Sequence, residues 1–208
     1  MNIHQALDWR YAVRQFSPEK LDNRAVESLL DAARKSASSY GLQPYKILVV
    51  ESREVRQALL AHSFGQQRVL DSSHLVIFAA LTDIGDHTVD RYVDQFVRTR
   101  RVPADEIDGY VQHMKGALAA KTSAEKKVWA HQQAYIALGT LLTAAAAMRI
   151  DSCPMTGFDH KAYDKVLGLT EFGLESTAIV ALGYRSELDS TADLPKVRFD
   201  YEEIVMRV

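Results

Sequence analysis

Residues 134–148 read AYIALGTLLTAAAAM, a stretch that is apolar or small on nearly every side. From residue 128 to residue 148 the sequence contains no Asp, Glu, Lys or Arg, although the polar residues 131–133 precede the apolar part. About 20 apolar residues are needed to cross a bilayer, so this stretch is too short to span one. It predicts a long helix over residues 124–148 that is buried in the protein core.

Three apolar, β-branched runs predict strands that are buried on both faces: YKILVV (45–50), LVIFAALT (75–82) and STAIVALGY (176–184). Apolar residues at helical spacing predict further helices. One begins after Asn2 and another after Asp22, and the others cover residues 53–62, 88–101, 104–120 and 160–167. Residues 151–158 are predicted to form a turn-rich crossover. These elements indicate one domain, residues 1–208, of the α/β or the α+β class.

The composition excludes several classes of protein. The 25 Lys and Arg residues nearly balance the 27 Asp and Glu residues, for a net charge of −2, which argues against nucleic-acid binding through bulk charge. Cys153 is the only cysteine, so neither an internal disulfide nor a cysteine metal cluster can form. The first residues contain no apolar signal region, and we expect a cytoplasmic protein with no membrane partner.

The motifs of several common enzyme classes are absent. No G-x-G-x-x-G, Walker A, G-x-S-x-G or H-E-x-x-H pattern occurs, and no two histidines lie four residues apart. These absences argue against the standard hydrolase, kinase and metalloenzyme classes, and we expect no metal site.

Four short segments carry the remaining polar chemistry: Arg10–Phe16, Ser36–Pro44, Pro154–Phe158 and Leu194–Arg198. Two arginines four residues apart on one helical face, as in the first segment, can clamp a phosphate. A glycine, as in the third, permits close approach of a planar ligand. Taken singly, the segments are equally well explained as an ion-paired helix face, surface loops and a solvated tail.

Together these segments resemble, in order and spacing, the nitroreductase-like flavoproteins, and the resemblance runs from residue 3 to about residue 199. It is closest to the oxygen-insensitive NAD(P)H nitroreductases and the dihydropteridine-reductase-like members. The resemblance implies the nitroreductase-like fold, which is an α+β fold of three α/β-like layers with a central mixed sheet flanked by helices. It also implies noncovalent FMN and a homodimer that exchanges its C-terminal tails.

The resemblance also implies a set of FMN contacts. The ribityl phosphate would be bound by Arg10, Tyr11, Ala12, Arg14, Lys196 and Arg198. Ser38, Ser39 and Tyr40 would come from the opposite subunit, and Gln66 and Arg68 would lie beside the pyrimidine edge. The segment Pro154, Met155, Thr156 and Gly157 would lie along the flavin, with the last two near N5.

In such a protein the flavin N5 carries the chemistry. NADH or NADPH would deliver a hydride to N5, and a small-molecule electron acceptor such as a nitroaromatic or a quinone would then take its place, in a ping-pong scheme. Two alternatives remain open: a flavin reductase for another acceptor (a pterin, an enone or a halogenated aromatic), and a flavin-binding protein without turnover.

Two further expectations concern the acceptor pocket and the tail. The helix near residues 104–120 has a low apolar content and occupies the position of a pocket cover, so Tyr110, Met114 and Lys115 are predicted to border the acceptor. The apolar tail residues Tyr201, Ile204, Val205 and Val208 have no partner nearby in the sequence, which predicts that they pack on a second subunit.

Overall fold

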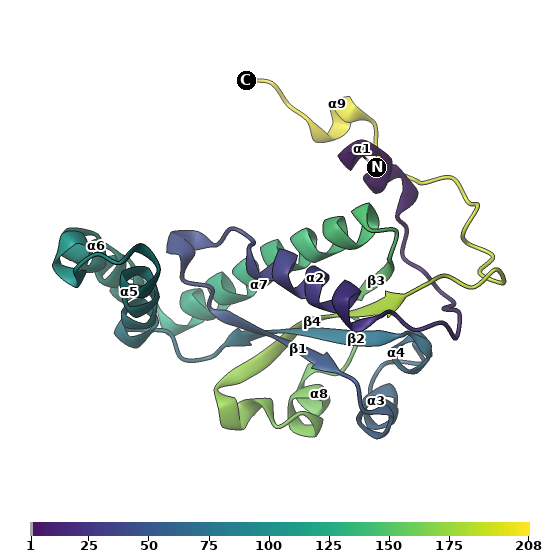
Figure 1. Ribbon diagram of the computed structural model, residues 1–208, viewed down its shortest axis with the longest axis horizontal. Coiled ribbons are helices and arrows are strands. Elements are labelled where there is room, and N and C mark those ends of the chain that lie inside the picture. The colour runs from purple at the N-terminus through teal and green to yellow at the C-terminus, as the bar shows by residue number, and fades with distance from the viewer. Residues whose placement is uncertain (1) are drawn as a thin grey trace.

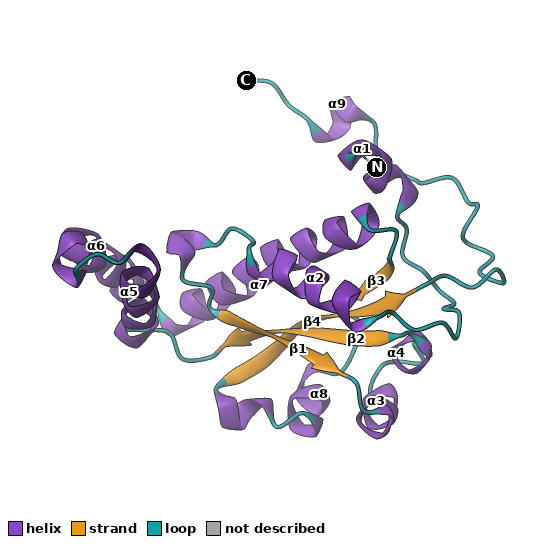
Figure 2. Cartoon of the chain, viewed as in Figure 1, coloured by secondary structure: helices purple, strands orange, loops and turns teal. Residues whose placement is uncertain are grey.

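Four strands form one sheet in the computed structural model, which describes residues 2–208 (Figures 1 and 2). In order across the sheet they are β1 (Tyr45–Val50), β2 (His74–Leu81), β4 (Leu174–Gly183) and β3 (Asp151–Met155). All three neighbouring pairs are antiparallel. The three strands predicted from the apolar runs are confirmed.

Two predictions about the sheet are wrong. The sheet is antiparallel and not mixed. Burial on both faces does not distinguish the two kinds of sheet here, because helices cover both faces and bury antiparallel strands as they would parallel ones. Residues 151–155 form strand β3 where a turn-rich crossover was predicted. Pro154 is tolerated there because β3 is an edge strand, where a missing N–H need not break a ladder between two neighbours.

Helices α2 (Asn23–Arg34) and α7 (Ser123–Ala147) lie on one face of the sheet, and α1 (Ile3–Trp9) packs against α7 farther from the sheet (Figure 1). Val76 and Phe78 of β2 point to this face and pack against the buried side of α7, including Ala134 and Leu141. The predicted long, buried helix is confirmed. Its first turn is fixed by a capping box, in which Thr122 and Glu125 satisfy each other's backbone N–H groups.

Helices α3 (Arg53–Leu60), α4 (Arg68–Asp71) and α8 (His160–Val166) cover the opposite face, together with the short helix η3 (Leu169–Phe172). Leu75 and Ile77 alternate along β2 with Val76 and Phe78. They point to this second layer, where they pack against Leu59 and Tyr163. The alternation is that of a strand buried on both faces, so the three-layer prediction holds.

Helices α5 (Asp86–Arg100) and α6 (Asp108–Ala119) project from one end of the sheet (Figure 1), joined by η2 (Ala104–Ile107), with η1 (Ser39–Gly41) beside them. The tail with α9 (Tyr201–Ile204) lies beside α1 at the other end. None of the helices within residues 2–208 has the length and apolar character that a membrane crossing requires.

Candidate functional site

The two ends of the chain meet at the buried carboxylate of Asp189. Its Oδ2 atom accepts hydrogen bonds from the backbone N–H groups of Arg14 (2.7 Å) and Gln15 (3.1 Å) and from the Tyr11 hydroxyl (3.2 Å). Its Oδ1 atom accepts from the backbone N–H and the hydroxyl of Thr191. Burial alone would raise the pKa of Asp189, but these hydrogen bonds outweigh it and lower the pKa to about 2.

The sequence predicted that Arg10 and Arg14 share one helical face, and this prediction is wrong. Helix α1 ends at Trp9, and Arg10 is already extended, with ψ 141°. The segment that follows runs beside β3, where the N–H of Val13 donates to the carbonyl of Ser152. The helix does not continue, because the hydroxyl of Tyr11 and the backbone N–H of Arg14 donate hydrogen bonds to Asp189.

A cavity of about 360 Å³ opens between this segment and the residues that follow Asp189. Its lining includes all four cations of the first and last motifs: Arg10, Arg14, Lys196 and Arg198. Tyr11 and Ala12 line it as well. Lys196 Nζ donates to the backbone carbonyls of Leu7 and Arg10, which fixes the tail against the end of α1.

The four cations of this cavity outnumber the one carboxylate in its lining, that of Asp8, so the charge of the lining favours an anion. Burial and the charge of Arg198 lower the pKa of Arg10, and burial together with Arg10 and Arg198 lowers the pKa of Lys196. The Nε atom of Arg10 is buried and has no hydrogen-bond partner among residues 2–208. A buried donor without a partner is costly, so the cavity favours a ligand that supplies an acceptor.

A second cavity, of about 540 Å³, shares Arg14 with the first and includes Gln66 and Arg68. The guanidinium of Arg68 donates to Gln66 Oε1 (2.7 Å) and to the sulfur of Met155 (3.1 Å). Gln66 Nε2 donates in turn to the carbonyl of Gly157 (2.6 Å). Gln66 and Arg68, which were predicted to lie beside the pyrimidine edge, therefore lie next to the predicted segment 154–157.

The end of β3 presents an open surface beside these side chains. Met155 is buried and Pro154 half-buried, whereas Thr156 and Gly157 are exposed. A Cβ atom added at Gly157 would meet no atom within 4 Å, and the φ of Gly157 is not positive. Neither packing nor backbone geometry within the chain calls for glycine here, which leaves room for a flat ligand to lie close to the backbone.

Ser38, Ser39 and Tyr40 lie away from both cavities, in and beside η1. The N–H of Ser39 donates to the side chain of Gln133 in α7 (2.8 Å), and Tyr40 has a left-handed backbone, with φ 56°. Figure 1 shows η1 and α1 toward opposite ends of α7. One chain therefore does not bring these residues to its own cationic cavity.

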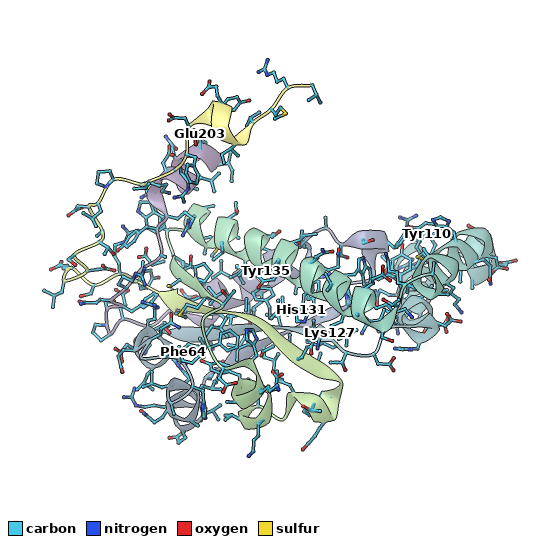
Figure 3. The ribbon with its side chains drawn as sticks, turned by 180° about the vertical axis from the view of Figure 1, so that it is seen from behind. Phe64, Tyr110, Lys127, His131, Tyr135 and Glu203 are labelled. Atoms are coloured by element: carbon cyan, nitrogen blue, oxygen red, sulfur yellow. The ribbon has the colours of Figure 1, made fainter. Side chains whose placement is uncertain are left out.

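The three residues predicted to border the acceptor have different environments. Tyr110 is 43% exposed and packs edge-on against Tyr40, with ring centroids 6.2 Å apart (Tyr110 is labelled in Figure 3). Lys115 forms an ion pair of 2.6 Å with Asp90 of α5. Met114 is fully buried in the core between α5, α6 and α7, so its predicted place at the pocket is wrong.

Sequence reasoning missed three residues that position the site. Asp189 joins the chain ends, Gln133 holds Ser39, and the buried Arg56 donates to the carbonyls of Val69, Ser72 and Ser73 behind Arg68. Only Gln133 left a signal, as an amide beside the apolar run of the long helix. Among residues 2–208, no group of three or more His, Cys, Asp or Glu side chains is placed to hold a metal ion.

Comparison with known proteins identifies the family to which this chain belongs. The profile of the family described as the Nitroreductase family matches residues 7–184, and the chain belongs to this family. The Bacillus subtilis protein named "Putative NAD(P)H nitroreductase YfkO" is 34% identical over 216 residues, covering 98% of this chain and 96% of that protein. A protein of Staphylococcus aureus (strain N315), also named as an NAD(P)H nitroreductase, is 34% identical over 218 residues, covering 98% and 94%.

Solved structures show the same fold at lower identity. The nitroreductase ydfN of Bacillus subtilis superposes with a TM-score of 0.87 at 19% identity, covering 99% of this chain and 98% of that one. A protein of Exiguobacterium sibiricum, described as a "putative nitroreductase in complex with FMN", gives a TM-score of 0.87 at 19% identity, covering 100% and 98%.

We expect Asp189→Asn to destabilise the protein in a pH-dependent way. An ionised Asp189 stabilises the fold above about pH 4, and this contribution is lost as the pH falls from the ordinary pKa of 3.8 toward about 2. At pH 7 the variant should lose about 2 kcal/mol of unfolding free energy, the scale of hydrogen bonds to a charged group. Urea unfolding at a series of pH values measures the difference, which should shrink on acidification; a constant difference would contradict the assignment.

Proposed function

We propose that this chain is an FMN-dependent NAD(P)H oxidoreductase that reduces nitroaromatic, quinone or similar acceptors. The observation that carries the proposal is the cationic cavity, in which Arg10, Arg14, Lys196 and Arg198 converge beside an unpaired buried N–H. A phosphate monoester supplies the charge and the acceptor oxygens that such a cavity lacks. The Exiguobacterium relative crystallised with FMN and the named NAD(P)H nitroreductases support the choice of FMN and NAD(P)H.

The residues of this chain would bind and orient the cofactor, which when bound supplies hydride transfer between NAD(P)H and the acceptor in a ping-pong scheme. Arg10, Arg14, Lys196 and Arg198 would hold its phosphate. Arg68 would place positive charge beside the ring system, where it favours added negative charge. Thr156 and Gly157 would leave one edge of the ring open for the two substrates in turn. No side chain need donate or remove a proton at the reacting atom.

We also propose that the chain acts as a homodimer with exchanged tails. Large apolar side chains are exposed along α7, where Tyr135 is 44% and Ile136 47% exposed, and along α1 and the tail. A second copy would bury these side chains. It would also bring Ser38, Ser39 and Tyr40 of one chain toward the cationic cavity of the other, which a single chain does not do.

The cofactor assignment is tested by purified protein and one substitution. The protein should be yellow, with the absorbance bands of oxidised flavin, and should oxidise NADH or NADPH in the presence of a nitroaromatic or a quinone. Arg10→Ala, and likewise Lys196→Ala, should weaken FMN binding by about tenfold or more, because each removes a charge-assisted bond of about 1.5–3 kcal/mol. Arg24→Ala, which removes an exposed cation of α2, is the matched control. Unchanged FMN affinity in both cavity variants would refute the site.

The acceptor pocket is tested on α6. Tyr110→Ala and Lys115→Gln should change the relative rates with a nitroaromatic, a quinone and an enone, while FMN remains bound. Met114→Ala should act differently, lowering the unfolding free energy by about 2–5 kcal/mol, because it leaves a cavity in the core. If both α6 surface variants keep the acceptor profile of the parent, α6 does not border the pocket.

The dimer is tested by removal of the tail. A chain that ends at Phe199 should lose dimer, flavin and solubility together, because obligate interfaces commonly bury more than about 2,000 Å² and leave no stable monomer. Analytical ultracentrifugation and the ratio of flavin to protein absorbance measure the first two effects. A full-length protein that sediments as a stable, yellow monomer at micromolar concentration would overturn the proposal.

A further inference from the structure

Arg56 of α3 is a buried cation that the proposed reaction does not use. It is 4% exposed, and it forms no ion pair with any carboxylate of residues 2–208. Burial, and then the charge of Arg53, lower the pKa of Arg56. A buried charge without an ion-pair partner is costly, so the hydrogen bonds that Arg56 makes have to offset this cost.

All the hydrogen bonds of the Arg56 guanidinium go to the C-terminal end of α4. The Nε atom donates to the carbonyl of Val69 (2.8 Å), and Nη1 donates to the carbonyl of Ser73 (3.0 Å). The Nη2 atom donates to both the carbonyl (2.6 Å) and the hydroxyl (2.7 Å) of Ser72. Figure 1 shows α3 and α4 side by side. One planar guanidinium therefore fixes three backbone carbonyls, because its donors point in several fixed directions.

Helix α4 needs these bonds because it has a single turn, Arg68–Asp71, and a helix this short has little stability of its own. The residues after it are closed to water, since Ser72 is fully buried and Ser73 is 7% exposed. The last carbonyls of a helix have no partners within the helix. Here Arg56 supplies them, and Lys20 adds a longer bond of 3.3 Å to the carbonyl of Ser72. The position of α4 therefore depends on Arg56.

The other end of α4 faces the candidate site. Arg68, its first residue, lines the second cavity together with Gln66, whereas Arg56 lines neither of the two cavities. The N–H of Ser72 donates to the carbonyl of Arg68 (3.2 Å), so one hydrogen bond joins the two ends of the turn. A displacement of the Ser72 end therefore moves the backbone that carries the Arg68 guanidinium.

We propose that Arg56 is a positioning residue for the flavin ring, because it holds the end of α4 and so keeps the Arg68 guanidinium at the pyrimidine edge. This inference rests on the proposed FMN-dependent function and names a residue that sets the reduction potential at that site. Positive charge beside the pyrimidine edge stabilises the negative charge that the ring gains on reduction. Arg56 acts only through Arg68.

The reduction potential of the bound flavin tests this role. Arg56→Met should weaken binding of reduced FMN relative to oxidised FMN by about tenfold, which lowers the midpoint potential of this two-electron couple by about 30 mV. The Kd of oxidised FMN should stay within about threefold of the parent, because the four cations of the phosphate cavity are unchanged. Arg56→Lys, which keeps the charge and part of the bonding, should shift the potential in the same direction by about threefold in the same ratio.

Arg53→Met is the matched control, because it removes an exposed cation from the same helix. It should keep the potential of the parent. In the flavin-free protein, amide hydrogen exchange in α4 should become about tenfold faster in Arg56→Met and stay unchanged in Arg53→Met, because only the first loses the bonds at the end of the turn.

A double variant shows whether Arg56 acts through Arg68. Arg68→Met alone should lower the potential at least as much as Arg56→Met, and the two together should lower it no further, since residues that act through one contact are not additive.

Three outcomes overturn the positioning role and leave the FMN-dependent function standing. In the first, the double variant shows the full sum of the two shifts, so that the charge of Arg56 acts directly on the ring. In the second, Arg56→Met and Arg56→Lys unfold at lower urea concentration but keep the parent potential, so that Arg56 serves the fold alone. In the third, Arg53→Met lowers the potential equally. A parent protein that binds no FMN overturns both proposals.

Discussion

The cationic site of this protein depends on the hydrogen bonds that Asp189 accepts. The residues that they join, Tyr11 and Arg14 on one side and Thr191 on the other, belong to opposite ends of the chain. Neither segment has a helix or strand of its own at this point, so the carboxylate acts together with two backbone hydrogen bonds, from the N–H of Val13 to the carbonyl of Ser152 and from the N–H of Ser186 to the carbonyl of Gln15. Arg185 adds to the same junction, since its guanidinium pairs with Asp151 at 2.6 Å and stacks over the Tyr11 ring at 4.6 Å. The sheet supports both segments, and the buried carboxylate of Asp189 joins one to the other.

Holding four cations around a small cavity opposes folding, and the structure shows how this cost is limited. Lys196 donates to two backbone carbonyls, and the pKa values of Lys196 and Arg10 are lowered first by burial and then by their cationic neighbours. Burial and the neighbouring cations both disfavour the charged forms of Arg10 and Lys196, and a bound anion would favour these forms. A ligand that binds only the folded state also adds to stability, by an amount that rises with the logarithm of the ratio of its concentration to its Kd. The same electrostatic arrangement therefore prepares the cavity for a phosphate and makes the protein more stable once one is bound.

Regular elements were predictable where periodicity and composition agree. The apolar runs at 45–50 and 75–82 are strands, and 134–148 lies in the long helix. Strand β3 was missed because the sequence DSCPM has low strand propensity and gains its stability from pairing with β4, a contact remote in sequence. For the site, the motifs identified the cations, but spacing could not show that α1 stops at Trp9 or that Met114 points into the core. Both depend on tertiary contacts that no local pattern encodes.

The distribution of the predicted cofactor contacts is the structural reason for proposing a site that is built from two chains. The cations and the end of β3 lie toward one end of α7, whereas Ser39 is fixed by Gln133 toward the other. A helix is rigid on this scale, so no loop motion within one chain closes the gap. An exposed groove formed by small residues of α7, including Gly139 and Ala144, lies between the two ends and allows another helix to approach closely. Two copies packed there in opposite orientations would put the start of one α7 beside the end of the other. A site split along a rigid helix is then completed twice by a single symmetric contact.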